Sequence, residues 1–409
     1  MSNAWLAVLN KQRPLSLLSI HGWTNFYRLF FVFTLFFCLF NNIRAQDDRS
    51  YQHGINFLQR PDNQWLLIWS SSGNTPTGKD NNGNWSHDIF SSLIDPQMPI
   101  IRPASLISRP EAQEPASSAI TDDGFIMITM EDGWNTQHEV AQRYAVYDSE
   151  MMPIKPYPQL VHDGGHSGHV AAVKNRFVVF YSDEWVDGGG IDNLGSGDDV
   201  LAKIYSSKGE LEYTVPVATG KTSRDWWPLV AGSKHTAILV WQRFIEGETW
   251  STLMMAILDP ETGQLLKRPV KIADNLKYYT YSAVYLSQLN RFLVTGTNNK
   301  GVGFAQLYTQ TGKLVSALEK LPSVMREAQI IQRHNGKQTT LVQAIEPSGI
   351  MVLTASTDHL AIQEQIKGTQ KWSIAGTDGI FVDENHLFLV GLSQNGLMQQ
   401  FFEIKSIAK

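Results

Sequence analysis

The chain has 409 residues, with 34 Lys and Arg against 39 Asp and Glu, which gives a formal net charge of −5 at pH 7. A nucleic-acid partner needs a basic surface, and this mild negative charge argues against one. The single cysteine, Cys38, excludes a disulfide framework or a thiolate metal site within the chain, so stability has to come from burial of a core.

Residues 1–45 are predicted to be a secretory signal segment. Arg28 precedes the apolar run LFFVFTLFFCLF, and the small residue Ala45 ends the polar stretch that follows. The run has about 12 residues, whereas a helix that crosses a bilayer needs about 20. An uncleaved anchor is the alternative, because the segment before Arg28 is long for a signal. Cleavage after Ala45 predicts a cysteine-free protein that is secreted, periplasmic or held at the cell surface, without stable membrane insertion.

The remainder, residues 46–409, contains a repeated β pattern. Short runs of β-branched, leucine and aromatic residues are typical of buried strands, and they recur here at intervals of about 45 to 60 residues. In chain order they begin near residues 64, 124, 176, 236, 291, 338 and 386, and they are QWLLIWS, GFIMITM, RFVVFYS, TAILVWQ, RFLVTGT, QTTLVQA and HLFLVGL.

Each run has similar flanks. A shorter strand is predicted upstream of each one: INFLQR, ASSAIT, GHVAAV, WPLVAG, YSAVYL, EAQIIQ and WSIAGT. A third strand such as VLAKIYSSKG and a looser fourth such as YTVPVAT follow. Four strands repeated seven times predict an all-β fold, a seven-bladed β-propeller in a single domain, whereas a pair of β-sandwiches would not repeat in this way. The pattern resembles the repeats of secreted bacterial propellers, and that resemblance implies a fold, not an activity.

Propeller geometry sorts the loops between two faces. Loops that lead into the first strands and loops between second and third strands open on the same face, whereas turns such as DPETG lie on the other. Aromatic rings on the first face offer flat surfaces to sugars, and arginines offer forked donors to carboxylate or sulfate. About half of the tryptophans are expected to pack between blades instead. The candidate substrate-binding residues are Trp134, His138, Trp185, Trp226, Trp227, Arg243, Trp250, Tyr279 and Trp372.

The segment HDGGHSGH presents three imidazoles among glycines. The spacing of His162, His166 and His169 would suit one face of a helix, but so glycine-rich a segment is not predicted to be helical. His166 and His169 are candidates for catalysis or substrate contact. A zinc site that includes His162 is an alternative, and so is a polar turn whose histidines bond only to backbone.

The segment DGGGIDNLGSGDD is a long loop between two strands, and such length is itself a sign of function. Asp187, Asp192, Asp198 and Asp199 bring carboxylates together in a way that suits calcium, although their order differs from that of an EF-hand. A solvated acidic loop is the alternative.

Familiar catalytic signatures are missing from the sequence, including G-x-S-x-G, the Walker loop, H-E-x-x-H and the sialidase box, and no organic cofactor is expected. His169, Arg224, Tyr281 and Arg326 fall at comparable positions at the start of four successive blades. In architecture and residue type the chain resembles the ulvan lyase-type propeller enzymes. That resemblance implies β-elimination in an anionic, uronic-acid-containing polysaccharide. His166 or His169 and Tyr281 would then be the acid and base, and Arg224 and Arg326 would neutralise the carboxylate.

Two other functions stay open. A non-catalytic module that binds a glycan or a protein at the cell surface needs the same aromatic face but no proton-transfer group. It is favoured if the His, Tyr and Arg side chains spread around the rim instead of converging on one point. A metal-dependent hydrolase that uses the three histidines would need a bound metal.

Overall fold

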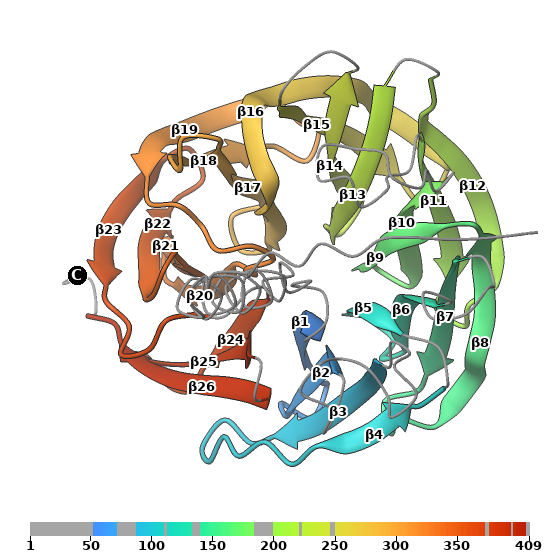
Figure 1. Ribbon diagram of the computed structural model, residues 1–409, viewed down its shortest axis with the longest axis horizontal. Coiled ribbons are helices and arrows are strands. Elements are labelled where there is room, and N and C mark those ends of the chain that lie inside the picture. The colour runs from blue at the N-terminus through green and yellow to red at the C-terminus, as the bar shows by residue number, and fades with distance from the viewer. Residues whose placement is uncertain are drawn as a thin grey trace, which may run out of the picture. The chain divides into compact units, whose positions relative to one another are not determined.

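The computed structural model describes residues 52–71, 87–109, 113–132, 140–183, 199–220, 223–245, 250–372, 376–393 and 396–405. They belong to one compact unit, Asp48–Lys409. The described residues form strands and turns, and they include no helix long and apolar enough to cross a membrane. Their strands build six antiparallel sheets arranged around a central axis, as in a β-propeller (Figure 1). The all-β prediction is confirmed.

Each sheet is a meander of consecutive strands. The first three sheets contain β1 (Gln52–Gln59), β2 (Trp65–Ser71), β3 (Asp88–Ile94) and β4 (Ala104–Ile107); β5 (Glu114–Ile120), β6 (Ile126–Asp132), β7 (Ala141–Tyr147) and β8 (Pro153–Asp163); and β9 (His166–Val173), β10 (Arg176–Asp183), β11 (Asp199–Ser206) and β12 (Leu211–Ala218).

The next sheet has seven strands: β13 (Ser223–Gly232), β14 (Ala237–Ile245), β15 (Ser251–Asp259), β16 (Gln264–Leu286), β17 (Arg291–Asn298), β18 (Gly303–Tyr308) and β19 (Leu314–Leu321). Two smaller sheets follow, with β20 (Ile331–Asn335), β21 (Gln338–Ala344), β22 (Ile350–Ala355) and β23 (Leu360–Ile366), and with β24 (Thr377–Phe381), β25 (His386–Ser393) and β26 (Gly396–Glu403).

The seven-stranded sheet owes its size to one long strand. β16 has 23 residues. Its first part pairs with β15 from Gln264 to Leu276, and its second part pairs with β17 from Leu276 to Leu286. One continuous strand is therefore the last strand of one meander and the first strand of the next.

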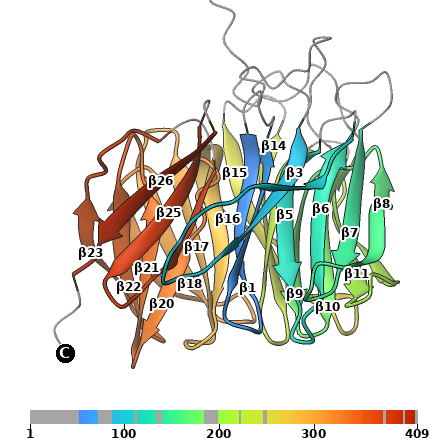
Figure 2. The ribbon, with the colours of Figure 1, turned by 90° about the horizontal axis from the view of Figure 1, so that it is seen from below.

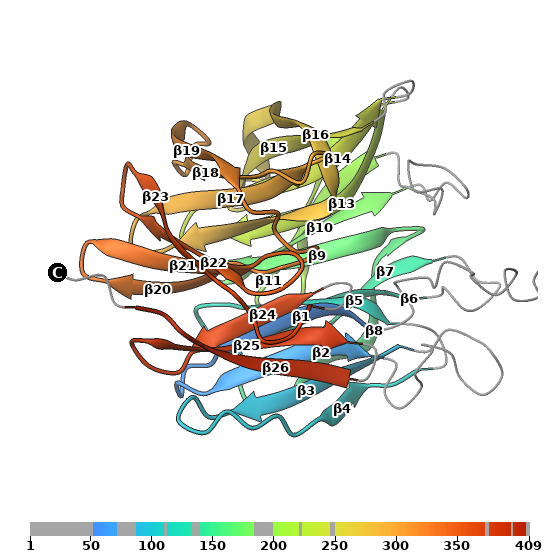
Figure 3. The same ribbon diagram turned by 60° about the vertical axis from the view of Figure 1, so that its left-hand side comes forward.

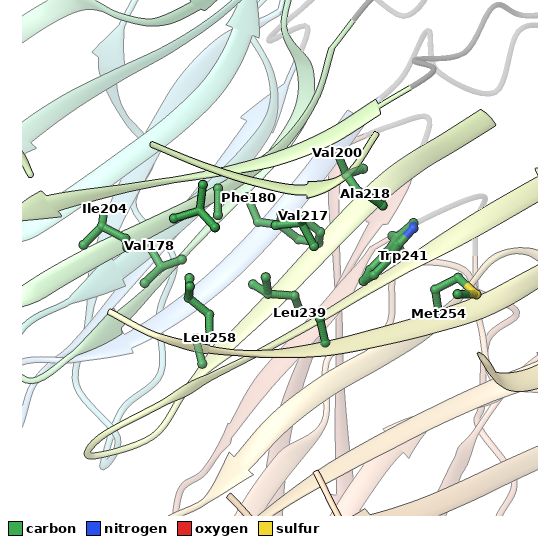
Figure 4. Close-up of a cluster of buried hydrophobic side chains, with 14 of the residues drawn as sticks. Val178, Phe180, Val200, Ile204, Val217, Ala218, Leu239, Trp241, Met254 and Leu258 are labelled. Carbon is green, nitrogen blue, oxygen red and sulfur yellow. The ribbon is translucent and has the colours of Figure 1, made fainter. Parts of the chain in front are cut away.

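All seven predicted apolar runs are second strands of these meanders, namely β2, β6, β10, β14, β17, β21 and β25. The reason is visible in the seam between the β9–β12 sheet and β13–β16 (Figure 4). Phe180 of β10 packs there against Trp241 of β14, with ring centroids 5.8 Å apart in an edge-to-face arrangement. Because such a strand is covered on both faces, its sequence is a continuous apolar run instead of an alternating one.

Two first strands begin later than the sequence pattern predicts. The segments EAQIIQ and WSIAGT are predicted strands, but β20 begins at Ile331 and β24 begins at Thr377. Glu327 and Gly376 have left-handed φ angles of 55° and 79°. A left-handed residue interrupts extended backbone, so the strand begins after it.

Hydrogen bonds from side chains join neighbouring first strands. Asn56 of β1 donates to the backbone of β5, and the Ser117 hydroxyl of β5 accepts the Val170 amide of β9 at 3.0 Å. The ring closes where the carboxylate of Asp378 in β24 accepts the Phe57 amide of β1 at 2.7 Å. Figure 3 shows β24 and β25 beside β1 and β2 at this closure, and Figure 2 shows the same ring turned by 90° from the view of Figure 1.

Candidate functional site

The candidate site lies where the first strands of the meanders begin. Four consecutive meanders have a non-glycine residue with left-handed φ in or just before the first strand: Ser167 in β9, Trp227 in β13, Tyr279 in β16 and Glu327 before β20, with φ of 54°, 54°, 54° and 55°. The strand pairing is irregular at three of these places, between Phe180 and Ser182 opposite β9, within β13 and within β16. Left-handed residues with a Cβ are strained, and such strain gathers at functional sites.

The bulge at Ser167 is held by side chains of the preceding sheet. The Ser167 amide donates to Glu131 Oε2 at 2.7 Å, and the Gly168 amide donates to Gln142 Oε1 at 2.8 Å. A Cβ on Gly168 would lie 2.5 Å from the Gln142 amide group, so a larger residue would have to displace that side chain from its hydrogen bond. The polar turn of the histidine segment is therefore fixed from outside its own strand.

His166 points into the interior. It is 1% exposed, and its Nδ1 pairs with the Ser167 hydroxyl at 3.0 Å. Burial lowers the pKa of His166 to about 3, so the ring stays neutral at physiological pH. A polysaccharide could reach this ring only if its enclosure opened, so burial does not favour the catalytic role of His166, which stays a prediction.

His169 is half-buried and has a defined tautomer. Its Nδ1 lies 2.9 Å from the Ser167 carbonyl oxygen, which can only accept, so Nδ1 carries the proton in the neutral ring. Nε2 then carries the lone pair, which is the state that a general base requires. Of the three histidines in the segment, His169 alone combines partial exposure with this arrangement.

Five rings form a contiguous series that we call the aromatic row: Trp250, Tyr278, Tyr279, Trp227 and His169. Consecutive ring centroids are 6.0, 6.3, 4.5 and 5.6 Å apart. Trp250 is 36% exposed, whereas Trp227 is 7% exposed and packs between its neighbours. The row therefore has an accessible end at Trp250 and a buried middle that fixes Tyr279 and His169.

Arg326 lies against the row. Its guanidinium carbon is 4.5 Å from the centre of the Tyr279 ring, and its Nε donates to Glu327 Oε1 at 3.0 Å. Its two terminal nitrogens have no hydrogen-bond partner among the described residues. The Glu327 amide donates to the Tyr279 carbonyl at 3.2 Å, which ties the two strand starts together. The guanidinium of Arg326 is thus held by Tyr279 and Glu327, and its forked end has the chemistry to bind a carboxylate or sulfate.

Tyr281 has a structural position. It is 1% exposed, its hydroxyl donates to the Trp227 carbonyl oxygen, and burial raises its pKa well above the ordinary value. The hydroxyl joins Tyr281 to the bulge at Trp227, and this burial does not favour its role as acid or base, which stays a prediction. Arg224 is half-buried at the start of β13.

Three other predicted binding residues have structural contacts: two tryptophans lie in the core, and Arg243 forms an ion pair. Trp226 is 3% exposed, and Trp372 is 8% exposed with its indole N–H donating to the Gly349 carbonyl at 2.9 Å. Both belong to the core, in line with the expected share of packing tryptophans. Arg243 forms a forked ion pair with the fully buried Asp225, with nitrogen–oxygen distances of 2.7 and 2.9 Å.

The predicted metal ligands do not form a cluster within the described part of the chain. No group of three or more His, Cys, Asp or Glu there could hold a metal ion. His162 Nε2 pairs with Asp183 Oδ1 at 2.8 Å, and Asp199 Oδ1 accepts the Gly220 amide at 3.0 Å. Six predicted residues lie outside the described residues, so their roles stay predictions: Trp134, His138, Trp185, Asp187, Asp192 and Asp198.

Sequence analysis missed Tyr278, Glu131, Gln142 and Glu327. Tyr278 had a usable signal, because it precedes Tyr279 in the segment KYYTYS. Glu131 and Gln142 act on a neighbouring sheet, and nothing in the local sequence reports a partner so far along the chain.

No protein-family model matches the chain, and no curated protein matches its sequence. Among solved structures it resembles the BP39L lectin from Burkholderia pseudomallei, at 12% identity and a TM-score of 0.56, over 88% of this chain and 100% of that one. It also resembles the WD40 domain of coronin from Toxoplasma gondii, at 8% identity and a TM-score of 0.50, over 87% and 82% of the two chains. An ulvan lyase bound to a glucuronate-rhamnose sulfate unit is similar at 11% identity and a TM-score of 0.45, over 76% and 80%. Identities this low indicate a propeller fold and leave activity to be argued from the site.

Proposed function

We propose that this protein is an extracytoplasmic, seven-bladed propeller that binds an acidic polysaccharide along the aromatic row. The count of seven treats the two meanders that share β16 as separate blades. The single observation that carries the proposal is Arg326, whose face packs on Tyr279 and whose Nε is bound to Glu327 while its fork stays unpaired among the described residues.

The aromatic row supports a sugar as the ligand. Trp250 is exposed and its ring is tilted by 34° to that of Tyr278, with centroids 6.0 Å apart, so the exposed indole offers an apolar surface to the C–H face of a pyranose. Arg326 supplies a charge-assisted contact to a carboxylate or sulfate of the same chain. A polymer that carries acidic groups at intervals can therefore contact both.

Binding is placed ahead of catalysis because the predicted proton-transfer groups do not converge. His166 and Tyr281 are each 1% exposed. His169 and Arg326 are separated along the row by Trp227 and Tyr279. Groups spread along a row favour a binding module over an active site.

Lyase activity is the second candidate, and the tautomer of His169 supports it. Nε2 could take the proton from the carbon beside the uronate carboxylate, while Arg326 stabilises the negative charge that develops there. The bond to the leaving oxygen breaks as a carbon–carbon double bond forms. The proton then passes from His169 to that oxygen, which balances the step.

Calorimetric titration with an oligogalacturonate tests the binding proposal, with the fully methyl-esterified oligomer as an uncharged match. We expect the acid to bind and the ester to bind at least about tenfold more weakly, since a charge-assisted hydrogen bond is worth roughly 1.5–3 kcal/mol. Arg326→Ala should weaken binding of the acid and Arg326→Lys should restore part of it. Arg102, which is exposed in the connection between β3 and β4, provides the control Arg102→Ala. Equal binding of acid and ester would contradict the proposal.

Ultraviolet absorbance of the unsaturated uronate product separates the two candidates in the same mixtures. A rising signal that His169→Ala abolishes would establish a lyase. A flat trace with binding intact would leave the binding module. Repeating both assays with calcium and then with a chelator tests the predicted metal, and N-terminal sequencing of the exported protein tests cleavage after Ala45.

A further inference from the structure

A second feature lies away from the aromatic row, in the outer wall of the ring. An open groove of about 680 Å³ runs between the outermost strands β12 and β16. One side is formed by Val215 to Ala218 of β12 and by Thr219, which follows that strand. The other side is formed by Gln264, Leu265, Arg268 and Pro269 of β16. Arg243 of β14 also lines it. The volume falls in the range of small-molecule sites, about 300–1,000 Å³.

The floor of the groove is rigid. Val217 and Ala218 of β12 pack with Trp241 of β14 in the apolar cluster that fills the seam beneath (Figure 4). The Trp241 indole N–H donates to Asp225 Oδ1 at 2.6 Å, so the same cluster holds the carboxylate that binds Arg243.

Asp225 binds two of the three guanidinium nitrogens of Arg243. Its Nε and one terminal nitrogen, Nη2, are bound to the two oxygens of Asp225, which is 0% exposed. The other terminal nitrogen, Nη1, has no hydrogen-bond partner in the described part of the chain, although 23% of the Arg243 side chain is exposed. A guanidinium clamped on one edge by a buried carboxylate presents its other edge in a fixed direction.

The charges of the groove are of one sign. Its lining residues, all of them described, include two arginines and no acidic side chain. Arg268 is exposed and forms no ion pair or hydrogen bond with a described residue. The aliphatic side chains of Val215, Leu265 and Pro269 border these cations, which is a surface that suits the C–H faces of a sugar.

We infer that the groove between β12 and β16 is a second site for an acidic saccharide, with Arg243 Nη1 and Arg268 binding one carboxylate or sulfate of the ligand. The site does not depend on the aromatic row, because no residue of the row lines the groove. A single polymer could occupy both sites, or two chains could be held side by side.

The test is the stoichiometry of the oligogalacturonate titration at fixed ionic strength. The wild-type protein should bind two oligomers. Arg268→Glu should remove the groove site, with affinity there at least about tenfold lower because like charges face each other. Arg243→Lys keeps a cation for Asp225 but loses Nη1, so it should weaken the same site without unfolding the protein. Arg102→Glu is the control with the same change in charge.

The outcomes separate the two sites. One site in the wild type that Arg326→Ala removes and Arg268→Glu leaves unchanged would overturn the groove and keep the row. One site that only Arg268→Glu and Arg243→Lys affect would keep the groove and overturn the proposed function. Binding that resembles the Arg102→Glu control in every variant would overturn both.

Discussion

Two regions of the ring solve the same backbone problem with different residues. Ser167 of β9, Trp227 of β13, Tyr279 of β16 and Glu327 just before β20 take a left-handed φ, whereas Gly54 of β1 and Gly376 just before β24 are the residues in this conformation there, with φ of 64° and 79°. Glycine takes the left-handed conformation freely, while a residue with a Cβ pays about 1 kcal/mol or more. We call the first set the side-chain bulges and the second set the glycine bulges. The glycines stand where a Cβ would collide with a neighbour, as at Gly54 against the Ala116 backbone, whereas the side chains at Ser167, Trp227 and Tyr279 make contacts in the candidate site.

The largest effect expected from this comparison is a change of folding stability with pH, caused by His166 beside the bulge at Ser167. The pKa of His166 falls from its ordinary 6.5 to about 3 in the folded protein. Below pH 6.5 the unfolded chain therefore binds a proton that the folded chain does not, and stability is lost as the pH falls from about 6.5 towards 3. At about 1.36 kcal/mol per pKa unit the loss is at most about 5 kcal/mol.

The loss of stability can be measured by urea unfolding of the wild type and of His166→Gln between about pH 6.5 and pH 3. The variant should lose less stability than the wild type on acidification, and parallel curves would contradict the assignment.

At the glycine bulges, the folding stability should change with pH in the opposite direction. Burial raises the pKa of Asp378, beside Gly376, from 3.8 to about 7, although two backbone amides donate to its carboxylate. Between pH 4 and 7 the folded chain keeps a proton that the unfolded chain has lost, so stability falls as the pH rises through this window. The change is at most about 4 kcal/mol.

Asp378→Asn should remove the loss of stability that ionisation of Asp378 causes between pH 4 and 7. Relative to the wild type, the variant should gain stability between pH 4 and 7, as followed by urea midpoints at constant slope. The two buried groups oppose each other from about pH 4 to 6.5, so each single variant should have a steeper pH profile than the wild type. If the stability of neither variant depends more steeply on pH than that of the wild type, the two regions are not electrostatically distinct.

Gly54→Ala tests whether the glycine bulges require glycine. The added Cβ would lie 2.1 Å from the Ala116 carbonyl oxygen, on a backbone with φ of 64°. Backbone atoms cannot move aside cheaply, so we expect a loss of about 3 kcal/mol in the free energy of unfolding. Gly336, with φ of 65° and nothing within 4 Å of its would-be Cβ, is the matched control. Gly336→Ala should cost only about 1 kcal/mol, and equal costs would mean that crowding at Gly54 is relieved.

Ser167→Gly gives the smallest expected effect. The glycine relieves strain of about 1 kcal/mol, and the lost pairing of the Ser167 hydroxyl with His166 is worth about the same. The free energy of unfolding should therefore change by less than about 1 kcal/mol. Binding of the acidic oligomer should weaken, because the Ser167 carbonyl that orients His169 becomes less constrained. A clear gain in stability with unchanged binding would erase the distinction between the two kinds of bulge.

The sequence predicts the strands well because both faces of each second strand are buried. Runs such as RFVVFYS and TAILVWQ keep their apolar character whichever register the neighbours adopt, so β10 and β14 could be located without knowledge of their partners. The third and fourth strands are less certain from sequence because they alternate, as β8 does between exposed and half-buried positions.

The site was predicted in part, and the bulges explain what was missed. Tyr279 and Tyr281 are two residues apart, and in a regular strand they would share a face. The left-handed φ of Tyr279 changes that alternation, so Tyr279 contacts Arg326 while the Tyr281 hydroxyl turns inward to the Trp227 carbonyl. A bulge leaves little trace in residue types when the bulged residue is not glycine.

The asymmetry of the joints between sheets has a mechanical consequence. The joint within β16 is a continuous peptide backbone, which no thermal fluctuation can part without disrupting pairing on both sides. At the closure, by contrast, the Phe57 amide is held by one carboxylate, that of Asp378. A ring under tension would therefore part at a joint made of side-chain contacts and not within β16, and the closure between the first and last sheets is one such joint, held by this hydrogen bond and an apolar cluster. Alkaline conditions, which charge Asp378 in its enclosed position, would lower the force needed to begin that opening.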